Sequence, residues 1–263
     1  MKKMMMLLVA LLVGAVGMGG VVFAAGDHSN VRTDHVAMPN GVANTLTVPS
    51  GWGAWGNTIF AGAGLTSPQA YSDKDDGVAG VGFGVGDPVE NLGLQVSLSV
   101  NDLSEQNNLS YGAVLHRYIG LGTSVAVGGE HLFRDKNKSD VGETYYLVLG
   151  YACQNIPSRS EGASGLHGSI GVGGGRFAHK SPSDVLDGKG EGGTYVFGAL
   201  AYEVFTRTNL ILEWNGLNLN AGIGILPFKH FPIGLTFGAA DLTSNTGDGV
   251  RFISSLGLAY KFN

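Results

Sequence analysis

The last thirteen residues of the chain, Arg251-Phe-Ile-Ser-Ser-Leu-Gly-Leu-Ala-Tyr-Lys-Phe-Asn263, predict a strand with one apolar and one polar face. Side chains that alternate with a period of two point to opposite sides of an extended strand. Chain ends usually fray in water, so an apolar stripe that ends in aromatic residues favours a strand in contact with lipid. Only Ser254 interrupts the apolar stripe, which consists of Phe252, Leu256, Leu258, Tyr260 and Phe262.

This strand resembles the C-terminal strand of bacterial outer-membrane β-barrels, which normally ends on the aromatic residue. Here Asn263 follows Phe262, a small departure from the pattern. The resemblance implies that outer-membrane lipid surrounds the wall, with Tyr260 and Phe262 as anchors at the membrane–water boundary. It also implies that the barrel-assembly machinery binds the last strand. The alternative is an edge strand of a soluble sandwich.

The first 25 residues have the parts of a cleavable signal peptide. A basic start, Met1-Lys2-Lys3, precedes an apolar run, and small residues end the segment at Ala24 and Ala25. The alternative, a membrane anchor, is disfavoured because four glycines dilute the segment. Beyond it, no apolar run approaches the roughly 20 residues that a membrane helix needs. A chain of this kind crosses a membrane only as a closed barrel, because lipid offers no partner for open strand edges.

From residue 57 onward the sequence predicts an all-β fold, a transmembrane antiparallel β-barrel of about twelve strands, with ten or fourteen as alternatives. The clearest alternation is at 91–100, and Asn215-Gly216 is a strong hairpin motif. The barrel is expected to occupy residues 57–263. Its predicted strands cover 57–65, 78–85, 91–100, 109–119, 121–131, 143–152, 167–177, 193–204, the two arms of the Asn215-Gly216 hairpin, 232–240 and the C-terminal stretch.

The predicted connectors alternate between long polar loops and short turns, as in outer-membrane barrels with both ends in the periplasm. Two connectors break this rule. The Asn215-Gly216 turn is short where a long loop is expected, and Cys153–Leu166 is long where a short turn is expected. Residues 26–56, rich in Pro and Gly, form either a periplasmic N-terminal segment or a plug in the lumen. Trp52 and Trp55 within it are expected to anchor at the inner, periplasmic interface of the outer membrane. Otherwise they form a flap over a soluble core.

Polar residues on the predicted inward faces are the main functional candidates, because they are costly against lipid and stable against water. They either line an aqueous path or pair across a narrow lumen and close it. Twelve strands lie between barrels filled by side chains and those that leave a channel. The candidate lumen-lining residues are Gln95, Ser97, Ser99, His116, Glu130, Glu213, Asn218, Asn220, Arg251 and Lys261.

Motifs for catalysis or cofactor binding are weak. The glycine strings at 80–84 and 171–175 lack the Lys and the helix of a phosphate-binding loop. The acidic loop 73–77 lacks the ligand spacing of a calcium site. His167-Gly168-Ser169 resembles the outer-membrane phospholipase family, whose serine and histidine lie on a barrel strand, but the family's Asn-Gly-Arg does not follow. We therefore expect no enzyme activity, no cofactor and no metal, and the single Cys153 is a tolerated residue near a turn.

The chain has 21 acidic and 16 basic residues, which argues against a nucleic-acid partner. Together these patterns predict a barrel in the outer membrane of a Gram-negative bacterium, exported through the periplasm. The predicted function is a porin-like passive channel for small polar solutes. A closed structural or surface-binding barrel with functional outer loops is the alternative, and a lipid-modifying enzyme is a third. The solute and the oligomeric state stay open.

Overall fold

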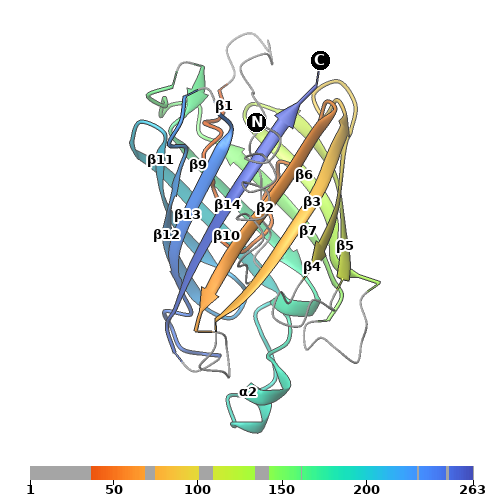
Figure 1. The fold of residues 1–263 in the computed structure, drawn as a ribbon, viewed down its shortest axis with the longest axis vertical. Helices are drawn as coiled ribbons and strands as arrows, with labels where there is room; N and C mark the ends of the chain where they lie inside the picture. Colours follow the sequence, from red (N-terminus) through yellow and green to blue (C-terminus); the bar gives the residue numbers. More distant parts are fainter. Residues whose placement is uncertain are drawn as a thin grey trace, which may run out of the picture.

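A closed antiparallel barrel of twelve strands forms the body of the protein in a computed structural model (Figure 1). The structure describes residues 37–68, 75–100, 109–133, 142–160, 162–229, 231–246 and 249–262. The wall strands are β2 (Thr58–Ser67), β3 (Asp76–Gly86), β4 (Gly93–Val100), β5 (Leu109–Gly120), β6 (Thr123–Leu132), β7 (Thr144–Ala152), β9 (Leu166–Gly173), β10 (Val196–Phe205), β11 (Thr208–Trp214), β12 (Leu219–Ile225), β13 (Ile233–Ala240) and β14 (Arg251–Lys261).

The last strand closes the barrel against the first. β14 pairs antiparallel with β2 in an unbroken register from Phe252↔Ser67 to Lys261↔Thr58. Thr58 and Lys261 therefore lie at the same end of the barrel, which we call the terminus end, and the opposite end is the loop end. The predicted fold class and strand number are confirmed, and the predicted closing strand is the one that seals the wall.

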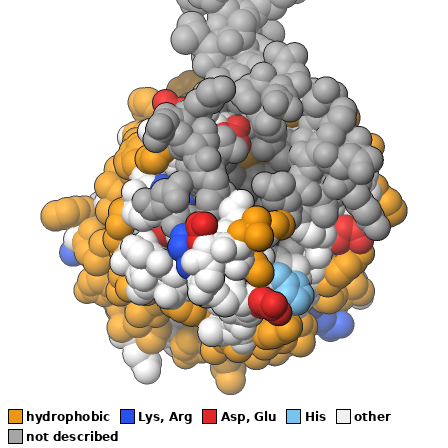
Figure 2. All heavy atoms as spheres, turned by 90° about the horizontal axis from the view of Figure 1, so that it is seen from below, with side chains coloured by type: hydrophobic (Ala, Val, Ile, Leu, Met, Phe, Trp, Pro, Cys, Tyr) orange, Lys and Arg blue, Asp and Glu red, His pale blue; other side chains and the backbone are white. Residues whose placement is uncertain are grey.

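Alternation along each strand separates an apolar outer face from a mixed inner face. On β7, Leu147 and Leu149 are half exposed on the outside, whereas Tyr146 and Val148 are buried inside. Figure 2, a view onto the loop end, shows hydrophobic side chains around the rim of the barrel. An apolar outer surface around a closed sheet is the surface that lipid requires.

Exposed aromatic side chains gather near both ends of the outer face, as expected at membrane–water boundaries. Tyr260 and Phe262 lie at the terminus end and contact each other edge to face. Their companions at that end are Tyr151, Phe205, Phe228 and Phe231, and the exposed aromatics toward the loop end are Tyr111, Phe133, Tyr145, Tyr195 and Phe252.

The strand predicted at 167–177 ends early, because the chain turns inward after Gly173. Gly175–Phe177 forms the short 3-10 helix η2, and Phe177 is completely buried. A further helix, α2 (Pro182–Leu186), lies in the same connector and projects beyond the loop end (Figure 1). No helix in the described ranges is long and apolar enough to span a membrane.

The two irregular connectors have structural explanations. The long connector after β7 carries β8 (Ala163–Ser164), which pairs in parallel with β1 (Met38–Pro39) where the N-terminal stretch approaches the barrel. The short turn after β11 is covered from the neighbouring connector, since Thr194 N donates to Gly216 O at 2.9 Å. The predicted signal peptide, residues 26–36 and residues 73–74 of the acidic loop lie outside the described residues.

Candidate functional site

Residues 37–56, which we call the inner segment, start beside β8 at the terminus end and run through the interior of the barrel. The first arm runs along β11 and β12 from the terminus end toward the loop end. Asn40 exchanges side-chain hydrogen bonds with Asn209 near the start of β11. Farther along, Leu46 packs against Gly222 of β12 so closely that a Cβ atom there would crowd it. At Thr47 the chain reverses and returns to the terminus end, where it begins β2.

The turn of the inner segment is held by one buried carboxylate, Glu213 of β11, which is 1% exposed. Its oxygens accept the backbone N–H groups of Leu46 at 2.6 Å, Thr47 at 2.8 and 3.0 Å, and Val48 at 3.2 Å. The Thr47 hydroxyl also donates to it at 2.5 Å, and Asn220 Nδ2 donates at 2.9 Å. A buried charge is tolerated only when it is fully hydrogen-bonded, so this contact fixes the position of the turn.

Arg176, from η2, holds the same turn from another side. Its Nη2 donates to Thr47 O at 2.7 Å, and its Nε forms an ion pair with Glu130 of β6 at 2.9 Å. The turn therefore lies between an acidic acceptor on β11 and a basic donor at the end of β9. Glu130 and Glu213 belong to the predicted lumen residues, whereas Arg176 does not, because the sequence places it in the strand predicted at 167–177.

Apolar contacts fill the space beside this turn. Val48 of the inner segment joins a buried cluster with Val148 of β7 and the rings of Phe177 and Phe197. The two phenylalanine rings stack with centroids 4.2 Å apart, and Tyr146 meets Phe197 edge to face. Phe177 reaches this cluster because η2 folds into the barrel.

The returning arm contacts β4, β5 and β7 at close range. Gly51 lies against the backbone of Gly150 in β7, which a Cβ atom on Gly51 would meet; a Cβ atom on Gly150 would meet the ring of Trp52. Ala54 N donates to Gln95 Oε1 at 2.7 Å, and Ala54 O lies 3.1 Å from His116 Nε2. Gln95 and His116 thus face the lumen as predicted, and the atoms they meet there are backbone atoms of the inner segment.

Trp52 does not lie at the expected membrane interface. Trp52 is 6% exposed and is buried inside the barrel with Tyr118 and Ala152, because its ring fills the space left by Gly150. Trp55 lies at the terminus end, where Lys261 Nζ sits 3.6 Å from its ring centroid. Lys261 points inward as predicted and stabilises the end of the inner segment through this cation–π contact.

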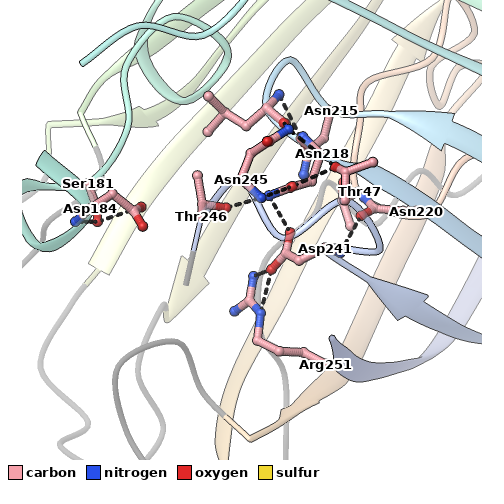
Figure 3. A network of polar contacts seen from close by, with 12 residues as sticks. Thr47, Ser181, Asp184, Asn215, Asn218, Asn220, Asp241, Asn245, Thr246 and Arg251 are labelled. Atoms are coloured by element: carbon pink, nitrogen blue, oxygen red, sulfur yellow. Dashed lines mark hydrogen bonds and ion pairs between the residues drawn. The ribbon is translucent and has the colours of Figure 1, made fainter. Parts of the chain in front are cut away.

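At the loop end, the predicted residues Asn218 and Arg251 enter a network around Asp241 (Figure 3). Arg251 Nε donates to Asp241 at 2.6 Å, and Asn218 bonds Asp241, Thr243 and Thr246. Burial raises the pKa of Asp241 above its usual value, and Arg251 opposes that shift. Asn220 accepts from Asp241 N at 2.9 Å and so links this network to Glu213.

Ser97 and Ser99 of β4 also have the predicted inward direction. Each lies across from a glycine on a neighbouring strand, Gly112 for Ser97 and Gly80 for Ser99. Both serines are partly exposed. The inward side chains thus form two regions. One is charged and holds the turn of the inner segment, through Glu130, Arg176 and Glu213. The other consists of small residues on β3, β4 and β5.

Hydrogen bonding between the inner segment and the wall is incomplete. In the described part of the chain, five buried side-chain atoms at this contact have no hydrogen-bond partner within the protein. They are Asn44 Oδ1, Thr45 Oγ1, Trp52 Nε1, Ser124 Oγ and His167 Nδ1. A buried polar atom left without any partner costs about 1–3 kcal/mol relative to its hydrated state. Withdrawal of the segment would hydrate them, which offsets part of the loss of its contacts.

The His167 and Ser169 pair lies on the lumen side of β9 near the terminus end. His167 is 1% exposed, and its Nε2 lies 3.2 Å from Nδ2 of Asn209, which also bonds Asn40. His167 is therefore linked to the inner segment through Asn209. No group of three or more His, Cys, Asp or Glu that could hold a metal is found among the described residues, and Cys153 is a half-buried free thiol.

These features define a membrane-spanning β-barrel with an internal segment. No family model and no curated protein matches the chain. Among solved structures, a KdgM porin in complex with disordered oligogalacturonate matches 78% of this chain and 99% of its own, with 8% identity and a TM-score of 0.45. Outer membrane phospholipase A from Escherichia coli matches 77% of this chain and 89% of its own, with 12% identity and a TM-score of 0.43. The Salmonella typhi enzyme, a dimer with bound calcium, matches 77% and 90% with 13% identity and a TM-score of 0.41. Likenesses this distant do not bear on what the chain does.

Proposed function

We propose that this protein is a porin-like passive channel of the bacterial outer membrane for small polar solutes, and that the inner segment controls its opening. The supporting observation is the contact between the segment and the wall. It combines one strong anchor, Glu213, with five buried polar atoms that lack partners within the protein. A contact of this kind favours the seated state without making withdrawal prohibitive, because the exposed groups regain hydrogen bonds to water.

The inward side chains support a path for polar solutes once the segment withdraws. Uncovered, the lumen presents carboxylates, amides, hydroxyls and guanidinium groups beside an apolar cluster that includes Phe177 and Phe197. Such groups replace part of the hydration shell of a passing solute and so lower the barrier to its passage. The outer face is expected to contact outer-membrane lipid, with β14 as the strand that the assembly machinery recognises.

A closed barrel with a surface-binding role is the second candidate, and one observation favours it. The connector after β9 projects beyond the loop end and presents Leu186, which is 87% exposed, from the short helix α2. Internal bonds order this connector, including Lys180 N to Glu191 O at 3.1 Å and the ion pair of Lys189 with Asp184 at 3.2 Å.

A lipid-modifying activity has less support. A bilayer lipid reaches the outer face of the wall, whereas His167 and Ser169 face the lumen beneath the inner segment. We therefore keep the passive, non-enzymatic function as the proposal.

Single-channel recording on the full-length protein in planar bilayers tests this proposal. We expect discrete openings that become more frequent in Glu213→Gln, because the neutral amide loses the charge-assisted bonds to Leu46, Thr47 and Val48. Glu90→Gln, at an exposed carboxylate in the turn between β3 and β4, is the matched control and should behave as the wild type. Silence of both the wild type and Glu213→Gln, from protein shown to be folded, would favour the closed barrel.

A further inference from the structure

The turn of the inner segment presents a peptide to two charged side chains in a defined arrangement. Glu213 accepts the N–H groups of three successive residues, Leu46, Thr47 and Val48. Arg176 donates to the carbonyl of the middle residue, Thr47, at 2.7 Å. Donors of the bound chain thus face the carboxylate, and an acceptor of the same chain faces the guanidinium.

A small solute can reproduce this arrangement. An ammonium group carries three N–H donors, as many as the backbone N–H groups that converge on Glu213. A carbonyl or carboxylate close to it offers the acceptor that Arg176 requires, and guanidinium groups bind such oxygens well. Amino acids and short peptides carry both groups a few bonds apart.

The charges around the turn favour the ammonium end of such a solute. Glu213 and Glu130 are acidic and Arg176 is basic, and the Glu130 ion pair already engages Arg176 Nε. The three side chains together carry one net negative charge. Glu213 is nearly inaccessible to water while the segment is seated, so an uncovered Glu213 needs a cationic or strongly donating partner. A sugar offers only neutral hydroxyl donors, whose bonds to a carboxylate are weaker than those of an ammonium.

We propose that Glu213 and Arg176, with Asn220 supporting the carboxylate, form a binding site for short peptides and related amino compounds, which the turn at residues 46–48 occupies when no solute is present. The role of this site in selecting solutes rests on the proposed channel function. Binding itself does not, because a peptide that competes for Glu213 displaces the turn whether or not solute then crosses the membrane.

Hydrogen exchange on the full-length protein in detergent micelles tests the binding step. Triglycine is the probe and sucrose is the neutral control. We expect saturating triglycine to speed amide exchange at Leu46, Thr47 and Val48 about tenfold, the effect of losing one hydrogen bond to a charged group. Sucrose should leave exchange unchanged. In Glu213→Gln these amides should already exchange fast and should not respond to triglycine, whereas Glu90→Gln should respond like the wild type.

Bilayer recording then separates this inference from the channel itself. With a conducting wild type, we expect triglycine to interrupt the open current, sucrose to leave it uninterrupted, and Glu213→Gln to lose the interruption. Conduction without any effect of triglycine on current or exchange would overturn the peptide site and leave the channel standing. An exchange response that is equal in wild type and Glu213→Gln would also overturn it. Silent bilayers combined with the expected exchange response would overturn the channel and retain the binding site.

Discussion

The side chains of each strand point alternately to the outer and the inner face of the barrel, and the two faces differ in what those side chains contact. On β7, Leu147 points outward and is 49% exposed, while its neighbour Val148 is fully buried in a cluster with Val48 of the inner segment. Outside, a side chain needs only to be apolar, because lipid adapts to its shape. Inside, it needs a particular partner from a distant part of the chain.

The largest loss of unfolding free energy is expected at Phe177, whose aromatic ring packs inside the barrel. Phe177→Ala removes a buried side chain that stacks on Phe197, and should cost about 3–5 kcal/mol of unfolding free energy. Urea unfolding of the protein refolded in lipid vesicles measures this change. Phe177→Leu, which keeps most of the volume, should lose much less. Equal losses would show that the ring does not pack as described.

A charge on the outer face should have the next largest effect. Leu147→Arg places a guanidinium near the middle of β7, against lipid, and should cost about 2–4 kcal/mol. Leu147→Phe serves as the control and should be tolerated. The same vesicle assay applies, and an unaffected arginine variant would contradict the assignment of this face to lipid.

The third largest loss of unfolding free energy is expected at Glu213. Glu213→Gln keeps the shape of the side chain and removes its charge, which should cost about 1.5–3 kcal/mol because several hydrogen bonds lose charge assistance. Limited proteolysis monitored at the inner segment should show faster cleavage near residues 46–48. Unchanged cleavage, with Glu90→Gln as the reference, would mean that the turn is held by other contacts.

The smallest loss of unfolding free energy is expected at the terminus end of the barrel, where Lys261 contacts Trp55. Lys261→Gln removes the cation over the Trp55 ring and should cost about 0.5–1 kcal/mol. Tryptophan fluorescence, to which Trp52, Trp55 and Trp214 all contribute, measures the change in stability during urea unfolding. Lys261→Arg, which keeps a cation, should stay close to the wild type, and a loss as large as that of the glutamine variant would point to a contact other than cation–π.

The sequence predicted the wall well because lipid on one side imposes a period of two over almost every strand. The same period gave the inward direction of Gln95, His116 and Glu213. It could not give their partners, because direction is a local property and the contact of Glu213 with Thr47 joins residues 166 positions apart. Only the folded barrel brings these two stretches together.

Two misplacements have physical causes that local pattern does not reveal. Trp52 was expected at the membrane interface because indole rings prefer that location, but they also fill space next to glycines, and Gly150 supplies such a space on the inner face. The sequence places Phe177 in the strand predicted at 167–177, in which Gly171, Gly173 and Gly175 alternate with other residues. Glycine alternation is equally compatible with the inward turn that η2 makes.

The junction between the inner segment and the wall bears on the order of assembly. Phe262 N donates to Asn57 O at 3.0 Å, and Lys261 lies against Trp55, so the seam of the cylinder and the root of the inner segment are the same place. If β14 paired with β2 first, residues 37–56 would afterwards have to enter the closed barrel through one of its ends. That step is avoided if β14 pairs with β2 after the inner segment has folded in front of β2. Closure of the barrel and filling of its interior are then a single event.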